Sequence, residues 1–423
     1  MKKTILILLA ALLTVLCVSS VSAASASTIL SPALEVISSK IIMVKSGLVA
    51  GSITFSKEDF NKGVGCAVDS ITLTSLPDPS DGVLLYNGSA VAINQTISSK
   101  GLDALKYVPT NSSDPSSFKF RTSGEYSIEC SIRYTDTLNL APTAGLTADS
   151  VSVWTQTDIT AFGKLSASDP EGDAMTFEIV QYPTKGILEL RDAMTGDYTY
   201  TPCANVTGKD SFTYAAVDEW GHYSEECSVI VDIEKAASDI SFADMDGHWA
   251  HNAAIVMAAE NAMETEEVDG KILFNPDENI TREDFLVTVM KILGAGDIPP
   301  AETVFADNDE ISEDASGYVA RAYSLGVISG EEIDGLSYFK PSSTVSRAQA
   351  AVILNTIIGA EEPDTVPVFA DGDSVPTWAR GALYALTSEG ILNGNGEGYI
   401  SPNAPLSRAQ AAQIFLKVKK LYS

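Results

Sequence analysis

Two different spacings of apolar residues divide the chain. Between residues 28 and about 234, short runs alternate apolar and polar side chains, as at residues 70–76 and 210–214, and turn-forming residues separate the runs. Alternation with a period of two predicts half-buried strands, and many short strands are typical of antiparallel sandwiches. The region also repeats itself, because residues 126–132 match residues 223–229 in register. We therefore predict two related antiparallel β-sandwich domains, at residues 28–137 and 139–234.

After residue 240 the apolar spacing becomes helical, as in Phe285, Val289 and Ile292 at i, i+4 and i+7. Three copies of one pattern fill this region. Each copy opens on Phe-Ala-Asp, at residues 242–244, 305–307 and 369–371, and closes about 40 residues later on Ser/Thr-Arg. A repeat of this length buries an apolar face only against its neighbours. We predict an all-α bundle of three helix–loop–helix repeats, at residues 241–295, 304–359 and 368–423.

The Ser/Thr-Arg pair of each repeat marks the start of its second helix. Thr281, Ser346 and Ser407 fit N-cap positions, and Ser-x-x-Gln in the last two repeats is a capping box. A cation in the first turn opposes the helix dipole, so the arginine that follows each cap needs another explanation. Helix N–H groups and a guanidinium together bind a carboxylate or phosphate well. The predicted anion sites are at Arg282, Arg347 and Arg408. The alternative is a helical core with incidental surface arginines.

Charge and the first residues limit the classes of function. The chain has 56 Asp+Glu against 27 Lys+Arg, a net charge of −29, and no basic stripe. Such a surface repels nucleic acid and anionic lipid, so we exclude nucleic-acid binding. Residues 1–26 have the features of a secretory signal, because Lys2 and Lys3 precede a short apolar run that small residues follow. We predict a secreted protein with no membrane span once the signal is removed.

Four cysteines follow the predicted signal, which is an even number in an exported chain. Such a count suggests two disulfides, and four cysteines allow three connectivities. We favour Cys66–Cys130 and Cys203–Cys227, because each pair falls within one predicted domain.

Residues 139–234 resemble the cadherin-like or immunoglobulin-like repeats of large bacterial surface proteins. The resemblance runs from Asn-Leu-Ala-Pro at residue 139, through the acidic loop at residues 165–173, to the strand at residues 210–214. Hard cations prefer clustered carboxylate oxygens. The loop therefore suggests a Ca²⁺ site with Asp169 and Asp173, which Asp218 would complete. The alternative is an acidic β-turn, since Asp, Pro and Gly themselves form turns.

The three C-terminal repeats resemble S-layer homology (SLH) motifs, through their Phe-Ala-Asp openings and Ser/Thr-Arg endings. In that family, three tandem motifs anchor exported bacterial proteins to the cell wall. The resemblance implies a pseudo-threefold helical spindle whose grooves hold a secondary cell-wall polysaccharide, commonly one carrying a pyruvyl ketal. It also implies that the arginines at residues 282, 347 and 408 pair with the pyruvyl carboxylate.

The same resemblance implies that Trp249 and Trp378 pack on the sugar or on the groove wall, with core packing as the alternative. Repeat two departs from the pattern, because Asp314 stands where the other repeats have tryptophan. We therefore expect the three grooves to bind unequally.

These observations favour a non-catalytic protein of the bacterial cell surface, held in the cell wall or S-layer. Its expected partners are a secondary cell-wall polysaccharide or another glycan linked to peptidoglycan, and neighbouring S-layer subunits. The β-domains would then face outward as an S-layer component or an adhesin. The alternative is an SLH-anchored enzyme with a reduced catalytic domain. Against it, the chain has only 3 histidines, and no Gly-x-Ser-x-Gly or phosphate-binding loop motif occurs.

Overall fold

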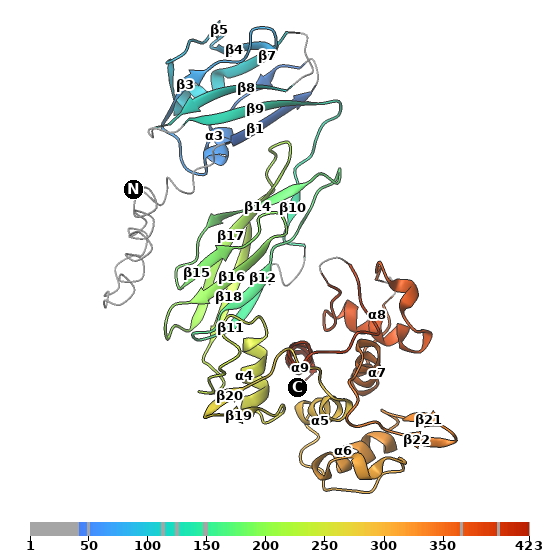
Figure 1. Ribbon diagram of the computed structural model, residues 1–423. Helices are drawn as coiled ribbons and strands as arrows, with labels where there is room; N and C mark the ends of the chain where they lie inside the picture. The colour runs from blue at the N-terminus through green and yellow to red at the C-terminus, as the bar shows by residue number, and fades with distance from the viewer. Residues whose placement is uncertain are drawn as a thin grey trace.

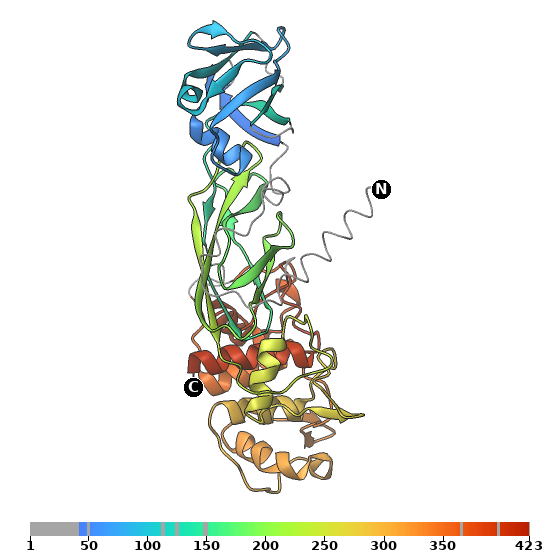
Figure 2. The same ribbon diagram turned by 90° about the vertical axis from the view of Figure 1, so that its left-hand side faces the viewer.

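The computed structural model describes residues 42–48, 51–110, 115–122, 127–146, 151–363, 367–395 and 398–422. The predicted signal at residues 1–26 lies outside these ranges. Two β-domains and a helical module follow one another along an elongated molecule (Figures 1 and 2). Within the described ranges, no helix is both long enough and apolar enough to cross a membrane.

The first domain consists of two facing sheets and one helix. Its larger sheet has the order β1(Ile42–Leu48), β9(Ile128–Thr135), β8(Ser116–Arg121), β3(Ser70–Ser75) and β6(Thr96–Ser98). The other has the order β2(Ile53–Thr54), β7(Leu105–Pro109), β4(Gly82–Tyr86) and β5(Ser89–Ala90). Helix α3(Lys57–Val64) buries Phe60 against Phe120, with ring centroids 5.2 Å apart. A 3₁₀ segment, Ser99–Ala104, leads into β7.

The second domain is a sandwich of two main sheets. One has the order β11(Ser152–Gln156), β18(Cys227–Glu234), β17(Gly208–Asp218) and β14(Met175–Gln181). The other has the order β12(Ala161–Lys164), β16(Asp197–Pro202) and β15(Gly186–Leu190), and β10(Thr143–Ala144) pairs with β13(Ala167–Ser168). Alternate residues of β16 and β17 fill the core, including Tyr198, Tyr200, Phe212 and Tyr214.

The prediction of sandwiches with antiparallel strands alone is wrong at one edge of each domain. β1 pairs in parallel with β9, and β11 pairs in parallel with β18. In the first domain the first described strand lies beside the last, and in the second domain β11, which follows the short strand β10, lies beside the last strand. Alternating polarity locates strands but carries no information about their direction, so the sequence pattern could not distinguish the two arrangements.

The predicted disulfides are also wrong, because none of the four described cysteines is joined to another. Cys130 is fully buried in β9, between Met43 and Phe118 in the sheet. Cys66 instead lies exposed just after α3. Their thiols therefore occupy opposite environments, and burial raises the pKa of the Cys130 thiol.

The second predicted disulfide fails because its cysteines lie at different heights of the sheet. Cys203 follows the end of β16, in the loop that leads to Gly208 at the start of β17. Cys227 pairs with Tyr214, six residues further along β17. Six residues of strand span about 20 Å, whereas a disulfide needs Cα atoms within about 7 Å.

Six α-helices form the framework of the C-terminal module in the described ranges, two for each repeat. They are α4(His251–Ala259), α5(Arg282–Ile292), α6(Glu313–Ser324), α7(Arg347–Ile358), α8(Arg380–Ser388) and α9(Arg408–Tyr422). Short 3₁₀ segments lie at Asn308–Glu310, Gly372–Ser374 and Thr377–Ala379. The predicted capping boxes at Ser346 and Ser407 are confirmed, and the Thr281 hydroxyl accepts the N–H of Asp284.

An all-α description of this module is nevertheless wrong. A two-stranded hairpin joins the helices of repeat one, β19(Glu266–Val268) with β20(Lys271–Leu273). Repeat two has its counterpart, β21(Glu331–Ile333) with β22(Leu336–Tyr338). Both hairpins turn on Asp-Gly at positive φ, which favours a two-residue hairpin loop.

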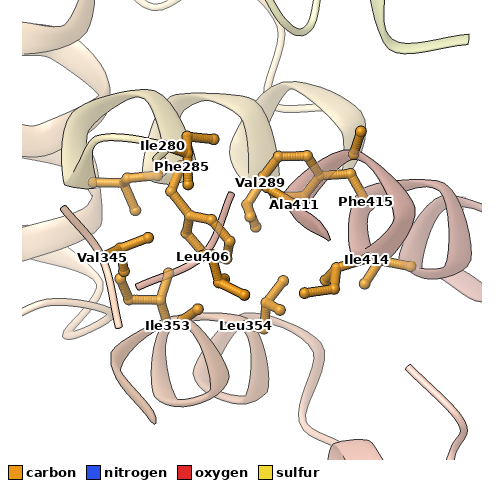
Figure 3. Close-up of a cluster of buried hydrophobic side chains, with 14 of the residues drawn as sticks. Ile280, Phe285, Val289, Val345, Ile353, Leu354, Leu406, Ala411, Ile414 and Phe415 are labelled. Carbon is orange, nitrogen blue, oxygen red and sulfur yellow. The ribbon is translucent and has the colours of Figure 1, made fainter. Parts of the chain in front are cut away.

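The three repeats close into a ring around a shared core. The N–H of Ile280 bonds to the carbonyl of Leu406, that of Leu406 to Val345, and that of Val345 back to Ile280. Each of these residues immediately precedes the N-cap of the second helix of its repeat. Their side chains meet those of α5, α7 and α9 at the centre, including Phe285, Leu354 and Phe415 (Figure 3). This cycle of bonds gives the module an approximate threefold arrangement.

The helical module contacts the second β-domain directly, through hydrogen bonds and a cation–π contact. Asn252 of α4 accepts the backbone N–H of Gln156 through its side-chain oxygen at 3.0 Å, and its own carbonyl accepts from the Gln156 side chain at 3.1 Å. The ammonium of Lys420 lies 3.5 Å from the ring centroid of Trp154. Because both polar residues of the first contact are buried, the junction is ordered by specific bonds.

Candidate functional site

The aspartate of each Phe-Ala-Asp opening holds a tight loop later in its own repeat. Asp307 is buried, and its two carboxylate oxygens accept the N–H groups of Phe339 at 2.9 Å and Lys340 at 2.6 Å. Asp244 and Asp371 make the same pair of bonds in the other two repeats. The middle residue of every loop has a positive φ, at Asn275, Lys340 and Ser401. The motif therefore shapes a loop whose carbonyls face the neighbouring repeat.

The predicted arginines reach across to these loops. Arg347 of repeat two donates from Nε to the Ile400 carbonyl at 2.7 Å and from Nη2 to the Asn393 carbonyl at 2.8 Å, both in repeat three. Arg408 of repeat three donates in the same way to the carbonyls of Phe274, at 2.9 Å, and Glu264 in repeat one. These bonds use two of the five N–H donors of a guanidinium. They give the arginines a structural role between repeats that we did not predict.

The third arginine completes the cycle through an aromatic contact. The guanidinium carbon of Arg282 lies 5.4 Å from the ring centroid of Phe339 in repeat two. Arg408 makes the corresponding contact with Phe274 at 5.1 Å. Every repeat thus extends its arginine onto the loop of the next.

Each arginine lies in a groove to which all three repeats contribute. The Arg347 groove has Trp249 of repeat one beside the loop of repeat three. The Arg282 groove has Trp378 of repeat three beside the loop of repeat two. The Arg408 groove has Asp314 of repeat two beside the loop of repeat one. The structure therefore brings the predicted arginines and tryptophans together in pairs, and it places Asp314 at the position of the missing tryptophan.

The exposure of these side chains suits a binding surface. Trp249 is 44% exposed and Trp378 is 60% exposed, which does not agree with core packing. The three arginines are partly buried, and burial lowers the pKa of Arg282, Arg347 and Arg408. A guanidinium that has lost part of its hydration gains more from a bound carboxylate. Each tryptophan-containing groove can therefore offer an anion partner and an aromatic face.

No signal within a single repeat could have located these pairs. Trp249 and Arg347, for example, are nearly a hundred positions apart and belong to different repeats. Only the ring closure brings the first helix of one repeat beside the second helix of another. Sequence reasoning found the residue types but not their partners.

The predicted acidic site lies where the two β-domains meet. Asp169, Asp173 and Asp218 offer one carboxylate oxygen each, and all three of these oxygens lie within 4.8 Å of one another. One oxygen of Asp169 and one of Asp173 are buried and have no hydrogen-bond partner. Partial burial, followed by the nearby carboxylates of Asp169 and Glu219, raises the pKa of Asp173. Unsatisfied buried carboxylate oxygens fit a hard divalent cation.

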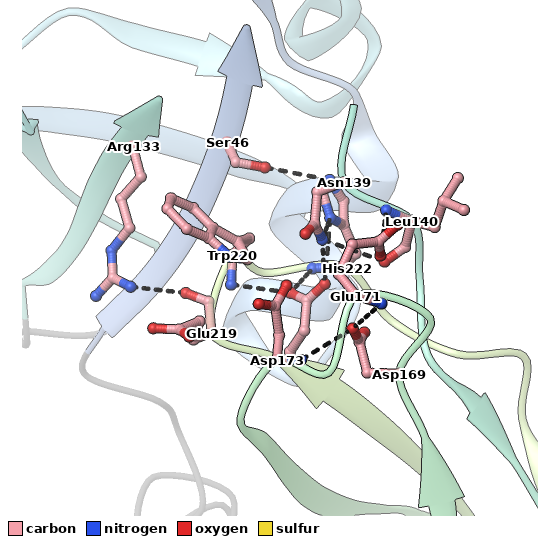
Figure 4. A network of polar contacts seen from close by, with 11 residues as sticks. Ser46, Arg133, Asn139, Leu140, Asp169, Glu171, Asp173, Glu219, Trp220 and His222 are labelled. Atoms are coloured by element: carbon pink, nitrogen blue, oxygen red, sulfur yellow. Dashed lines mark hydrogen bonds and ion pairs between the residues drawn. The ribbon is translucent and has the colours of Figure 1, made fainter. Parts of the chain in front are cut away.

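The same cluster is linked to the first domain (Figure 4). Asp218 accepts the side-chain amide of Asn139 at 2.6 Å and the backbone N–H of His222 at 2.8 Å. The His222 ring lies within hydrogen-bonding distance, 3.1 Å, of the Ser46 hydroxyl in β1. Arg133 of β9 donates to the Glu219 carbonyl at 2.7 Å. Through Asp218, the acidic cluster is therefore linked by hydrogen bonds to residues at the interface between the domains.

Comparison with known families agrees with this architecture. The S-layer homology domain family matches residues 241–286, 305–351 and 368–412, which lie within the three ring-forming repeats and include all three arginines. The bacterial cadherin-like domain family matches residues 139–235. The chain carries three SLH repeats and a bacterial cadherin-like domain. The predicted resemblance is confirmed.

Relatives of the SLH protein include both surface-layer proteins and enzymes. S-layer protein EA1 of Bacillus anthracis is 31% identical over 191 residues, 44% of this chain and 21% of that protein. An S-layer protein of Bacillus licheniformis is 31% identical over 193 residues, 44% of this chain and 21% of that protein. An amylopullulanase of Thermoanaerobacterium thermosulfurigenes is 26% identical over 186 residues, 42% of this chain and 9% of the enzyme.

The chain spans about a fifth of the length of the two S-layer proteins that it matches. Its SLH repeats and these relatives indicate a cell-wall-anchored protein at the bacterial surface, as predicted. Among solved structures, Drosophila N-cadherin matches 46% of this chain and 65% of its own length at 14% identity, with a TM-score of 0.22.

Proposed function

We propose that the protein is a non-catalytic anchor that binds an anionic secondary cell-wall polysaccharide in the grooves of its SLH module. The observation that carries this proposal is the Arg347 groove. There the backbone carbonyls of repeat three hold a partly desolvated guanidinium beside the exposed Trp249. The two β-domains extend from the anchor in the outward direction, as an S-layer component or an adhesin.

The chemistry of the groove suits an acidic sugar such as one that carries a pyruvyl ketal. A guanidinium pairs with a carboxylate through short charge-assisted bonds, and a tryptophan face packs against the apolar face of a sugar ring. Opposing carboxylates elsewhere on this acidic chain are screened beyond about 8 Å at physiological salt. The affinity for the glycan therefore depends on contacts inside the groove. The net negative charge of the chain slows association with an anionic glycan but does not prevent binding.

Co-sedimentation with purified wall sacculi tests the anchor. We expect the full chain to sediment with intact sacculi and to remain in solution after acid extraction of the secondary polymers. Trp249→Ala is expected to weaken sedimentation, because it removes an exposed aromatic face and leaves the core intact. Binding that survives both the extraction and the substitution would show that the chain binds peptidoglycan itself and not the secondary polymer.

An anchored enzyme is the competing function, since an amylopullulanase is among the relatives. Two of the three histidines make contacts that give them structural roles. The His222 ring contacts Ser46 and Asn139 at the domain junction, and His248 Nδ1 accepts the N–H of Ala250. Incubation with sacculi should therefore release no reducing sugar above background, and steady release would establish catalysis.

We also propose that Ca²⁺ binds at Asp169, Asp173 and Asp218. The specific observation in its favour is the pair of buried carboxylate oxygens without hydrogen-bond partners. When bound, the ion would offset two of the three negative charges close to the contact between the β-domains. Calorimetric titration of the full chain with Ca²⁺ should give one site that Asp173→Asn removes. An unchanged heat signal in this variant would refute the assignment.

A further inference from the structure

The three SLH grooves share one architecture but not one chemistry. The Arg347 groove has a volume of about 420 Å³ and contains the cations Arg347 and Lys417. Its other polar side chains include Gln410 and Gln413, and no carboxylate lines it among the described residues. An anion entering this groove meets cations, amides, hydroxyls and the aromatic side chains of Trp249 and Tyr399, but no described carboxylate.

The Arg408 groove is strongly acidic. It has a volume of about 310 Å³, and two cations, Arg408 and Lys291, lie in it. The five carboxylates that line it are Glu264, Glu283, Asp284, Asp297 and Asp314. Because all five line the same groove, they repel a bound anion together.

The Arg408 groove also lacks an exposed tryptophan, and the aromatic residue that lines it, Tyr318, is buried. Asp314, in the first turn of α6, is exposed at the position that Trp249 and Trp378 occupy in the other repeats. One residue therefore removes a stacking surface and adds a negative charge. Neither change affects the bonds that Arg408 makes to the carbonyls of repeat one.

The Arg282 groove is intermediate. It has a volume of about 500 Å³ and keeps its tryptophan, Trp378. Its described carboxylate, Glu331, is paired with Lys340 at 2.7 Å, which leaves the Arg282 charge in excess.

We propose that the acidic group of the polysaccharide is bound in the Arg347 groove, with the Arg282 groove as a second and weaker site, and that the Arg408 groove excludes it. The inference rests on the proposed function, because it assigns the anionic glycan to particular grooves. Arg408 then serves to close the ring of repeats. One chain holds at most two acidic groups.

A matched pair of variants separates binding from ring closure. Arg347→Gln and Arg408→Gln remove equivalent bonds to two backbone carbonyls of the next repeat. Calorimetric titration of each full chain would use a hexosamine that bears a pyruvyl ketal, with its uncharged methyl ester as the control ligand. We expect at least tenfold weaker binding for Arg347→Gln and less than a twofold change for Arg408→Gln. The stoichiometry of the unmodified chain should not exceed two.

Equal losses in the two variants, or three equal sites in the unmodified chain, would overturn the assignment while leaving the anchor function intact. Absence of binding by the unmodified chain would instead overturn the proposed function, and the assignment with it. If Arg347→Gln does not fold, the exposed pair Trp249→Ala and Asp314→Ala replaces it. Trp249→Ala should weaken binding at least fivefold, and Asp314→Ala should not weaken it. A loss caused by Asp314→Ala would refute exclusion from the Arg408 groove.

Discussion

At the scale of single residues, the aspartate of Phe-Ala-Asp explains why each repeat begins with this motif. A non-glycine residue at positive φ costs roughly 1–2 kcal/mol, and each repeat has one in the loop that receives the neighbouring arginine. The carboxylate offsets this cost, because two N–H bonds to a charged acceptor contribute about 1.5–3 kcal/mol each. The motif therefore stabilises a strained loop that contacts the next repeat.

Asp307→Ala should therefore destabilise the SLH module by about 2–4 kcal/mol, since it leaves the buried N–H of Phe339 and the half-buried N–H of Lys340 without an acceptor. Urea denaturation followed by tryptophan fluorescence would measure the change. Asp309→Ala is the control, because Asp309 is exposed only two positions away, and it should shift the midpoint very little. Similar midpoints for both variants would contradict the proposed role of the motif.

The charge of Asp173 leads to a prediction about pH. Its pKa is raised in the folded protein by partial burial and neighbouring carboxylates. A carboxyl group with a raised folded pKa stabilises the fold below its unfolded pKa, and this contribution is lost as the pH rises through the folded value. In a chelator at neutral pH, Asp173→Asn should thus raise the melting temperature of the β-domains. With saturating Ca²⁺ it should lower that temperature, because a ligand is missing.

Scanning calorimetry in both conditions would show the reversal of sign. A decrease of equal size in chelator and in Ca²⁺ would mean that Asp173 has only a local structural role.

At the scale of secondary-structure elements, local features were predictable and long-range ones were not. The capping boxes at Ser346 and Ser407 depend on atoms within four residues, so the sequence pattern was sufficient. The Asp-Gly turns of the two hairpins were also visible as a signal, but we read these segments as loops. Strand direction and the partner of each arginine depend on contacts between distant segments, which no local pattern encodes.

The cysteines illustrate the same limit. Membership of one domain makes a pair plausible, but a disulfide requires a match within a few ångströms. Cys130 faces the core while Cys66 faces solvent, and this difference arises from the pleat of β9 and the end of α3 rather than from spacing.

The hairpin of repeat two can be tested at its turn. Gly335 has φ +79° and would have no atom within 4 Å of an added Cβ, so Gly335→Ala strains only the backbone. We expect a loss of roughly 1 kcal/mol. Gly372→Ala is the matched control, because Gly372 is equally open but has no positive φ. Urea midpoints should separate the two variants, and equal midpoints would mean that the turn conformation is not strained by alanine.

At the scale of the whole molecule, the repeats form a closed ring and not an open array. A solenoid loses stability gradually when a terminal repeat is removed. Here every groove takes one wall from each repeat, and Phe415 of the last helix packs on Phe285 of repeat one at 5.1 Å between ring centroids. The smallest functional unit is therefore the full set of three.

A chain that ends at residue 359 should consequently lose all binding to sacculi, not one third of it. The truncation removes α8 and α9 and exposes the shared core, so the remaining helices should lose cooperative unfolding by circular dichroism. Co-sedimentation at equal protein concentration provides the comparison with the full chain. Residual binding by two repeats would show that a groove can form without the ring.

The parallel pairing of β11 with β18 has a mechanical consequence. The chain reaches the start of β11 after the short strand β10, and it leaves the second domain at the end of β18, toward the wall anchor. A pull on the outer domain draws these neighbouring strands past each other lengthwise. All the backbone bonds along the five paired positions then bear the load together, rather than opening one after another. The domain thereby resists such a pull through a strand pair that is loaded in shear.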